Sequence, residues 1–499
     1  MAPDDNTGHS RSRGVSRRQF VKATGASGVA LSVAGCTGNG GDGGDTTTTT
    51  GEGGGSNAGI TVQFGADSNF KKVQPEINQI LHDNGLAENI KLEVLAGSFT
   101  TGDRQTKYKQ ILNAKQSSPT ILMMDNGWTI PFIARNQIAN LSKEMPGSLV
   151  DKVMNDYFQA SVSTATMDGD LYGIPLFADF PTMLYRKDLV REAGYSDSDF
   201  KSWQTDSMTW QKFSNVVKES LEANSDKDYQ GYNFQAAAYG GLSCCDFVEW
   251  MSSWGGAYFG GFDNLFGPIG DREITVTEQP VVDSINMVKH FINGGNPGGK
   301  FGDYAGNISP NAVVQYKEES SRKPFQSGNV MFHRNWPYAI NAAAPKYGDD
   351  LGVMPLPYAV SESESKYDNI GGISSALGGW HLTLNPNASD KKLDAAKQIF
   401  QAITTEEAQL SLFELGGWIP PVPDMVASDE AKNLDTIGPY VDSLKVAGEN
   451  AVPRPVTVVW PQQSSQISKE VNGSLQGNKG AKKAMSDLEK SLEQIESSV

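Results

Sequence analysis

Two side chains that could bind a small molecule follow a continuous apolar run in the first third of the chain. Asp125 and Trp128 come directly after residues 121–124, which predict a buried strand. A carboxylate accepts hydrogen bonds and an indole ring stacks on flat apolar faces, so this pair could hold a ligand. Asp125 could equally cap the helix that follows, and that alternative stays open.

The sequence contains no motif of a known catalytic class. GxSxG, HExxH and Walker sequences are missing, and the five histidines are scattered over His9, His82, His290, His333 and His381. We therefore expect no catalytic residue, no metal ion and no cofactor. A tethered glycoside hydrolase remains an alternative, because a chain rich in Asp and Glu always offers pairs of carboxylates.

The chain has three cysteines, and two of them are adjacent. Cys244 and Cys245 lack the spacing of a zinc site or of a CxxC redox motif. Neighbouring cysteines can form a strained vicinal disulfide or remain as two thiols. We favour two buried thiols, since free cysteine behaves as a small apolar residue.

The elements that should position Asp125 and Trp128 alternate between strands and helices. Alternating apolar residues predict strands at 60–64 and 90–94, and a helical spacing of apolar residues follows each of them. In β-α-β-α-β order with right-handed crossovers, the loops after the strands meet at one edge of an open sheet, where ligands bind. These loops are residues 66–69, 97–103 and 125–128.

The N-terminal segment predicts export and a lipid anchor. Arg17 and Arg18 precede a small-residue apolar run that resembles a twin-arginine signal, and residues 1–35 end at a lipoprotein-like processing box before Cys36. A membrane helix is the alternative, but the run is only about 15 residues long and a span takes ~20. Residues 36–59, rich in glycine, threonine and aspartate, predict a disordered tether.

The expected mature protein is strongly acidic. Removal of residues 1–35 takes away five basic and two acidic residues and moves the formal charge from −16 to −19. Such a field repels nucleic acid, so no nucleic-acid partner is expected. The charge is typical of proteins that stay dispersed at high salt, with ordinary acidic solubility as the alternative. About 440 residues remain after the tether, which favours two lobes over one core.

Four tracts carry a more specific pattern when they are taken in order. They are residues 173–189 (GIPLFADFPTMLYRKDL), residues 325–332 (FQSGNVMF) with Asn335-Trp336 and 353–357 (VMPLP) after them, residues 378–382 (GGWHL), and residues 420–423 (PPVP) with Arg454-Pro455 downstream. Over most of residues 60–480, they resemble the family 1 extracellular solute-binding proteins of ABC transporters, the group of maltose- and trehalose-binding proteins. The resemblance implies an α/β, two-lobed periplasmic-binding-protein fold of type II, with a sugar in the cleft between the lobes.

The resemblance also implies ligand-binding residues. A sugar has apolar C–H faces and a rim of hydroxyls, which aromatic rings and carboxylates recognise. Trp380 is the first stacking candidate because two glycines before it let the backbone approach a ligand closely, and a core tryptophan beside a turn is the alternative. Asp125 and Trp380 should reach one sugar from opposite lobes. Further candidates are Trp128, Asp179, Tyr185, Trp336, Trp418 and Arg454.

Two of the expectations depend on finer details of the chain. Leu184 replaces an aromatic residue that the family often carries before Tyr185, which weakens the assignment of Tyr185. For the lobes, we expect residues 60–165 plus about 325–375 in lobe 1, and about 166–324 plus 376–499 in lobe 2.

The resemblance implies transport without catalysis. A monomer tethered through lipid on Cys36 at the outer face of the cell membrane would capture a sugar by hinge closure and deliver it to the transmembrane subunits of an ABC permease. The same fold could instead bind a polyol, a glycerol phosphate or a peptide. An adhesive surface protein is disfavoured because the chain has no internal repeats.

Overall fold

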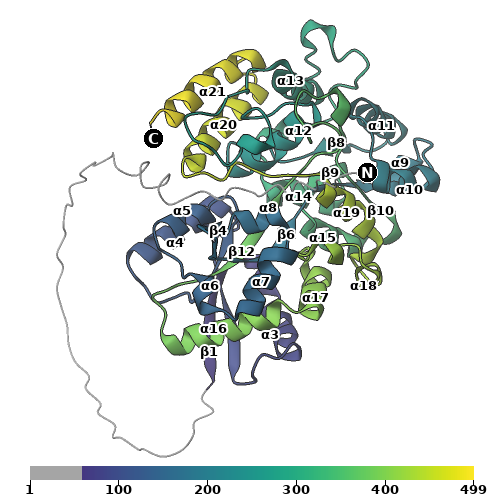
Figure 1. Ribbon diagram of the computed structural model, residues 1–499. Helices are drawn as coiled ribbons and strands as arrows, with labels where there is room; N and C mark the ends of the chain where they lie inside the picture. The colour runs from purple at the N-terminus through teal and green to yellow at the C-terminus, as the bar shows by residue number, and fades with distance from the viewer. Residues whose placement is uncertain (1–58, 499) are drawn as a thin grey trace, which may run out of the picture.

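A five-stranded mixed sheet organises the first lobe of the protein (Figure 1), whose structure is a computed structural model that describes residues 59–498. The strand order is β2-β1-β3-β12-β6; β1 pairs in parallel with β2 and β3, whereas β12 is antiparallel to both β3 and β6. This confirms the expected β-α-β-α-β start. The strands are β1 (Ile60–Ala66), β2 (Ile90–Ala96), β3 (Ile121–Asp125), β6 (Ile174–Asp179) and β12 (Gly378–Leu384).

Helices cover both faces of this sheet because β3 is apolar on both sides. Ile121 and Met123 pack in the cluster that includes α3 and α16, whereas Leu122 and Met124 pack with α4 and α5 on the opposite face. Ile399, Phe400 and Ile403 lie on the buried side of α16. The helices of this lobe are α2 (Ser68–Lys72), α3 (Gln74–Asp83), α4 (Thr101–Asn113), α5 (Thr129–Ala134), α6 (Leu141–Glu144), α7 (Gly147–Asp156), α8 (Gln159–Ser163), α16 (Asp390–Ile403) and α17 (Glu406–Gly416).

A four-stranded sheet organises the second lobe (Figure 1). The order is β10-β7-β9-β8, in which β7 is antiparallel to β10 and β9, and β8 is parallel to β9. The strands of this sheet are β7 (Thr182–Arg186), β8 (Gln230–Asn233), β9 (Val330–Asn335) and β10 (Leu351–Met354). The short strands outside the two sheets are β4 (Thr166–Met167), β5 (Asp170–Leu171), β11 (Ser375–Ala376) and β13 (Ala451–Val452).

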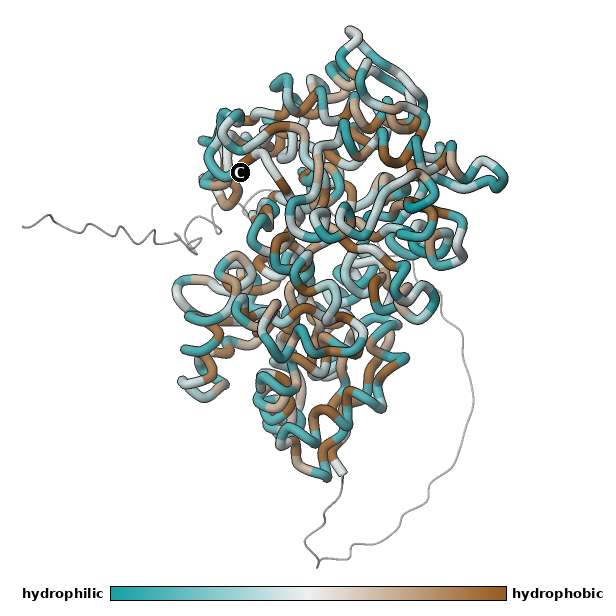
Figure 2. The backbone as a smooth tube through the Cα atoms, turned by 90° about the vertical axis from the view of Figure 1, so that its right-hand side faces the viewer, coloured by the Kyte–Doolittle hydropathy of each residue, from teal (hydrophilic) through white to brown (hydrophobic). Residues whose placement is uncertain are grey.

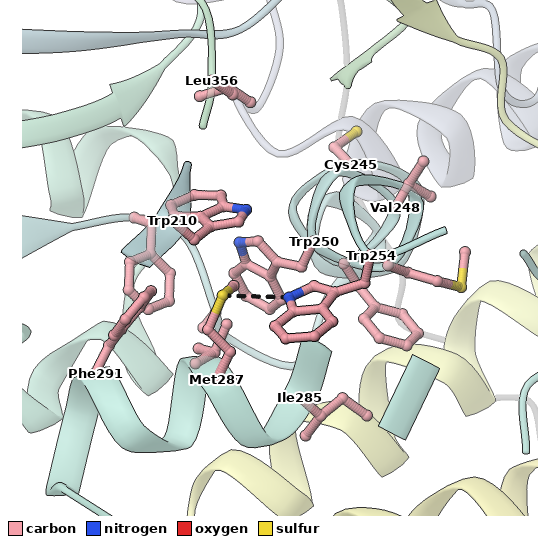
Figure 3. Close-up of a cluster of buried hydrophobic side chains, with 14 of the residues drawn as sticks. Trp210, Cys245, Val248, Trp250, Trp254, Ile285, Met287, Phe291 and Leu356 are labelled. Carbon is pink, nitrogen blue, oxygen red and sulfur yellow. Dashed lines mark hydrogen bonds between the residues drawn. The ribbon is translucent and has the colours of Figure 1, made fainter. Parts of the chain in front are cut away.

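The second lobe contains a large aromatic core between α11, α12 and α13 (Figure 3). There the indole N–H of Trp254 lies 3.3 Å from the sulfur of Met287. Near the C-terminus, α21 packs into this lobe through Met485, Leu488 and Leu492. The helices are α9 (Lys187–Arg191), α10 (Asp197–Asp206), α11 (Trp210–Ala223), α12 (Phe247–Ser253), α13 (Gln279–Asn293), α14 (Glu318–Ser327), α15 (Tyr338–Tyr347), α18 (Asp429–Lys432), α19 (Val441–Glu449), α20 (Trp460–Leu475) and α21 (Ala481–Glu496), with the π-helix η1 (Leu242–Asp246) directly before α12.

The chain crosses between the lobes at three places that lie side by side. The crossings follow β6, precede β12 and follow α17. Gly378 pairs with Asp179 in the sheet, and the N–H of Ala178 donates to the carbonyl of Ile419 at 3.0 Å. Adjacent short crossings of this kind form a hinge about which two lobes can rotate.

The segments are shared between the lobes differently from our expectation. β9 and β10 lie in the second sheet, within the residues 325–375 that we assigned to lobe 1, and β6 and β12 lie in the first sheet although we assigned both to lobe 2. The reason is physical: a strand's periodicity indicates which of its faces are buried but not which sheet completes its hydrogen bonds.

Apolar segments run through both lobes, and hydrophilic loops lie at the periphery (Figure 2). Among the helices of residues 59–498, none combines the length and the apolar character that a bilayer span requires. The assignments to Arg17, Arg18, Cys36 and the tether up to residue 58 lie outside the described residues.

Candidate functional site

A cavity of about 380 Å³ lies between the two lobes and is lined by both. The first lobe contributes the loops that follow β1, β2 and β3, as the sheet-edge argument predicted, and the hinge crossings contribute Asp179, Trp380 and Trp418. The second lobe contributes η1 and the starts of α14 and α20. The volume falls in the range of ~300–1,000 Å³ that is typical of small-molecule sites. A ligand here would contact both lobes and the hinge.

Asp125 lines the cavity but is already engaged by protein donors. Its carboxylate accepts from the backbone N–H of Gly127 at 2.7 Å, from the hydroxyl of Thr101 at 3.1 Å and from Nη1 of Arg454 at 3.0 Å. Both partners of the ion pair are largely buried. Asp125 therefore organises the end of β3 and positions Arg454, which follows β13, rather than offering a free acceptor.

Trp128 belongs mainly to the core behind this loop. Its indole N–H donates to Thr101 Oγ1 at 2.8 Å, and its ring packs on Phe132 with the centroids 5.5 Å apart. It is the N-cap residue of α5, and Asp125 caps a turn rather than the helix itself. Only an edge of Trp128 is therefore available to the cavity.

Trp380 is the more exposed tryptophan of the first-lobe wall. It lies on β12 directly opposite Asp125 in the register of the sheet, so the expectation that the two come from opposite lobes is wrong. The cause is the antiparallel insertion of β12 beside β3. The guanidinium of Arg104 lies over the Trp380 ring at 4.0 Å from its centroid, which is a cation–π contact.

Arg104 is a buried cation with little direct hydrogen bonding. One nitrogen lies 3.2 Å from a carboxylate oxygen of Asp67, yet none of the three guanidinium nitrogens has an aligned hydrogen-bond partner among the described residues. Asp67 also caps α2 by accepting from the N–H groups of Asn69 and Phe70. Arg104 also lines the cavity, and because a buried guanidinium without hydrogen-bond partners is costly, an acceptor that reached it would be stabilised.

The two glycines before Trp380 make room for protein atoms, not for a ligand as we expected. A Cβ on Gly378 would lie 2.8 Å from the ring of Trp336, and one on Gly379 would lie 2.9 Å from the carbonyl oxygen of Phe177. Gly379 also has φ near +137°, a conformation that side-chain-bearing residues rarely adopt. The Gly-Gly pair thus lets Trp336 of the second lobe pack against the hinge.

Trp336 and Trp418 line the cavity with one face of each ring backed by protein. The guanidinium of Arg334 lies 4.8 Å from the Trp336 centroid. Trp418 stacks on Phe70 with the centroids 4.0 Å apart and the planes 17° apart. Each tryptophan therefore has at most its other face or an edge open to the cavity. A free face is what a stacking ligand needs.

Asp179 and Glu318 are the carboxylates of the cavity that form no ion pair among the described residues. Burial raises the pKa of Asp179 well above its usual range, and the nearby Arg334 opposes this shift. Glu318 accepts from the hydroxyl of Tyr239 at 2.8 Å, and burial raises its pKa as well. The lining has more carboxylates than guanidinium groups, so it favours neutral ligands with hydroxyl donors over anions.

Tyr185 does not belong to the site, and its assignment is wrong. It is fully buried in the second-lobe core, where its ring stacks on Phe332 with the centroids 5.7 Å apart and also contacts Phe200 and Trp203. On β7 the side chain of Tyr185 points into this core, because neighbouring residues of a strand face opposite sides of the sheet.

The structure also corrects the cysteine assignment and adds residues that the sequence reasoning missed. Cys244 and Cys245 form a vicinal disulfide rather than two thiols, and both line the cavity. Asp67 and Arg104 could have been found at the predicted sheet edge, whereas nothing in the local sequence pointed to the second-lobe residues other than Trp336. The second-lobe residues that were missed include Tyr239, Glu318, Tyr338, Trp460, Ser464 and Ser468.

Three solved structures share the two-lobed architecture. The maltose-bound MalE3 of T. maritima aligns with a TM-score of 0.70 at 23% identity, over 87% of this chain and 99% of that one. A solute-binding protein of an ABC transporter from Thermotoga lettingae, bound with α-D-tagatose, aligns at 0.67 and 19%, over 88% and 100%. UgpB from Mycobacterium tuberculosis, in complex with glycerophosphocholine, aligns at 0.65 and 16%, over 88% and 98%. At these identities the likeness shows the fold.

Sequence comparison shows the family. A protein from Deinococcus radiodurans, described as a probable ABC transporter-binding protein, is 30% identical over 399 residues, which are 79% of this chain and 83% of that protein. The family model for bacterial extracellular solute-binding proteins matches residues 81–438, well over half of the chain. With a two-lobed fold and a cavity between its lobes, this chain belongs to the family of bacterial extracellular solute-binding proteins.

Proposed function

We propose that this protein is the solute-capturing component of an ABC importer and that its solute is a sugar. One observation carries the proposal. The interlobe cavity is lined by a tryptophan from each lobe, Trp380 and Trp336, and by two carboxylates without an ion-pair partner among the described residues, Asp179 and Glu318. Indole faces suit the C–H faces of a sugar ring, and the carboxylates accept from its hydroxyls.

The charges of the cavity favour a neutral solute over an anionic one. Arg104 lies beside Asp67 and Arg454 pairs with Asp125, so each guanidinium has its charge balanced within the protein. A glycerol phosphate would bring its negative charge into a buried site where neither guanidinium is left to balance it, at a cost in free energy. The polyol alternative shares the hydroxyl chemistry but lacks a flat ring face for the tryptophans, so we rank it second.

Capture by closure follows from the position of the cavity at the hinge. A ligand shifts the lobes toward the closed state only if it binds that state more tightly than the open one. Contacts with Trp380 and Asp179 on one side and with Trp336 and Glu318 on the other would exist together only in the closed state. The closed, loaded form would then be the one that a permease recognises.

Binding is tested by a thermal-shift screen followed by calorimetry, in high salt because of the acidic charge. The panel contains maltose, maltotriose, trehalose, mannitol, glycerol phosphate and a tripeptide. We expect a rise in the melting temperature with at least one di- or trisaccharide, because a ligand that binds only the folded state stabilises it by mass action. A shift with glycerol phosphate or the peptide alone would contradict the proposal.

The same samples separate transport from hydrolysis. Purified protein incubated with each oligosaccharide is analysed by chromatography for cleavage products. We expect the oligosaccharide to be recovered intact while it still stabilises the protein. Release of shorter sugars at a steady rate would instead support the glycoside hydrolase alternative.

We also propose that the protein is exported by a twin-arginine signal and held at the membrane by lipid on Cys36. Cys36→Ala should release the protein from the membrane fraction into the medium, because the lipid would be lost. Replacing Arg17 and Arg18 with lysine should keep the unprocessed chain inside the cell. Immunoblots of cell, membrane and medium fractions measure both outcomes, and membrane retention of the Cys36→Ala protein would overturn the anchor.

A further inference from the structure

The vicinal disulfide lies at the boundary between the second-lobe core and the cavity. Cys244 and Cys245 sit in η1, a π-helical turn that leads into α12, and π-helical turns are frequent at functional sites. Cys245 packs in the aromatic core together with Val248 and Trp250 (Figure 3), yet both cysteines line the cavity. The disulfide is thus backed by rigid core packing on one side and faces the site on the other.

Two glycines precede the disulfide in the cavity wall, where both cysteines are themselves largely buried. Gly240 and Gly241 have no side chain, and a Cβ built on Gly240 would meet only the hydroxyl of Ser464, at 4.0 Å. The ring of Tyr239 folds back over Gly241 and occupies the space that a Cβ there would need. Both glycines line the cavity next to the cysteines. A larger residue at 240 or 241 would cover this part of the wall.

A row of hydroxyls on α20 lines the same cavity as the disulfide. The hydroxyls of Ser243 and Ser464 are hydrogen-bonded at 2.6 Å and join η1 to α20. Ser464, Ser465 and Ser468 of α20 all line the cavity. An apolar, polarisable sulfur surface with hydroxyls beside it matches a sugar ring, which has an apolar C–H face and polar groups at its rim.

A purely stabilising role does not account for this disulfide. Cross-links stabilise a fold mainly by restricting the unfolded chain, and the effect grows with the length of the loop that they close. Cys244 and Cys245 are adjacent in sequence, so their bond closes almost no loop. What the bond does achieve is to fix two side chains in one arrangement at the cavity wall, at no further entropic cost when a ligand binds.

We propose that the Cys244–Cys245 disulfide is a ligand-contacting surface of the second-lobe wall, on which a ring of the bound sugar rests. This inference depends on the proposed sugar-binding function. Reduction by dithiothreitol transfers two electrons and two protons to the disulfide, gives two thiols and converts the reagent to its cyclic disulfide. The two side chains then rotate independently, and the fixed surface is lost.

Calorimetry with the disaccharide of the panel that gives the largest thermal shift, maltose or trehalose, tests the contact. We expect Cys244→Ala/Cys245→Ala to bind it about 10-fold more weakly, while the melting temperature of the ligand-free protein moves little. Wild-type protein treated with dithiothreitol should lose affinity to a similar degree. The double variant is the matched control for the reagent, since dithiothreitol should change nothing there. Equal affinity for the oxidised, reduced and double-variant proteins would overturn the proposal.

A second measurement needs only the wild-type protein and stands even if the double variant does not fold. Thiols that appear under dithiothreitol are trapped with iodoacetamide and counted by mass spectrometry, with and without saturating disaccharide. We expect the bound sugar to slow reduction by about 10-fold or more, and mannitol, if it gives no thermal shift, to leave the rate unchanged. An equal rate with bound sugar would overturn the contact. If the proposed function itself is wrong, the thermal-shift screen shows it first, because no sugar of the panel then stabilises the wild-type protein.

Discussion

Each lobe presents to the cavity a tryptophan that a buried arginine covers, and the two arginines differ in how their donors are used. Arg334 behind Trp336 donates to Gln235 at 2.7 Å and to both carboxylate oxygens of Glu249, with Asp246 at 3.5 Å. Arg104 over Trp380 has one ion pair and three guanidinium nitrogens without aligned acceptors among the described residues. Both arginine side chains are almost fully buried.

The difference separates a scaffold from a binding surface. Burial opposes the charge of Arg334, but Asp246 and Glu249 outweigh it and raise the pKa of Arg334. Each of its three guanidinium nitrogens has a hydrogen-bond partner within the protein, so we interpret the second-lobe pair as a structural support. The first-lobe pair keeps unsatisfied donors beside a partly exposed indole, so we interpret it as the side that recognises the ligand.

The largest expected effect tests the scaffold. Arg334→Met should lower the free energy of unfolding by about 3–5 kcal/mol, because Glu249 and Asp246 would remain buried without their cation. Urea titration followed by fluorescence measures the change. Arg191→Met is the matched control in the same lobe, because Arg191 forms exposed ion pairs with Asp197 and Asp350 and should change stability by less than about 1 kcal/mol. Equal losses of unfolding free energy in Arg334→Met and Arg191→Met would contradict the interpretation of Arg334 as part of a scaffold.

The second largest expected effect is on how stability depends on pH, and it compares one buried histidine in each lobe. His333 precedes Arg334 and His381 follows Trp380, and burial lowers the pKa of each from 6.5 to about 3. Both stay neutral in the folded protein, whereas the unfolded chain takes up protons below pH 6.5. Each histidine should therefore cost about 1.4 kcal/mol of stability per pH unit as the pH falls from 6.5 toward 3.

The variant His381→Gln isolates the first-lobe share of this pH dependence. Its unfolding free energy, measured by urea titration at several pH values, should fall less steeply below pH 6.5 than that of the wild type. The difference between the two slopes should approach about 1.4 kcal/mol per pH unit, which corresponds to one proton taken up on unfolding. Parallel curves would mean that His381 is protonated in the folded protein, contrary to the lowered pKa that its burial causes.

The third largest expected effect is a loss of sugar affinity on the first-lobe side of the cavity. Trp380→Ala should weaken sugar binding by about 1–3 kcal/mol in calorimetry and should barely move the melting temperature of the ligand-free protein, because Trp380 is half-buried at the cavity. Trp203→Ala is the matched control, a fully buried tryptophan of the second-lobe core. It should lower the melting temperature and leave the affinity unchanged. The assignment fails if Trp380→Ala binds as well as the wild type or does not fold.

The smallest effect tests the free donors of Arg104. Arg104→Gln should lower sugar affinity about 10-fold, which is about 1.4 kcal/mol, since a ligand acceptor would lose its charged donor. Stability should change little, because Asp67 keeps its two backbone donors at the start of α2. Arg135→Gln, a more exposed arginine outside the cavity, should leave the affinity unaltered. A stability loss with no loss of affinity would make Arg104 a scaffold like Arg334.

Local patterns predicted the first-lobe side of the site better than the second-lobe side. The wall built from strand ends follows a general rule, so the periodicity of the chain was enough to place Asp125, Trp128 and the loops at 66–69 and 97–103 at one edge. The second-lobe wall comes from η1 and the starts of α14 and α20, and no periodicity marks such segments as neighbours. Tyr185 was misplaced for a related reason, because a strand position alone does not indicate which face meets the cavity.

The sequence by itself determined the α/β class and the strand and helix order of the first lobe, because these depend on local periodicity. The ordered tracts determined the family resemblance and, with it, the cavity-lining residues Asp179, Trp336, Trp380, Trp418 and Arg454. Only the tertiary structure decided that β12 inserts antiparallel between β3 and β6, which puts Trp380 beside Asp125 instead of across from it. It also decided that Arg104 covers Trp380 and that the cysteine pair closes into a disulfide at the cavity. These are contacts between distant segments, and their free energy comes from packing and hydrogen bonding that no local pattern encodes.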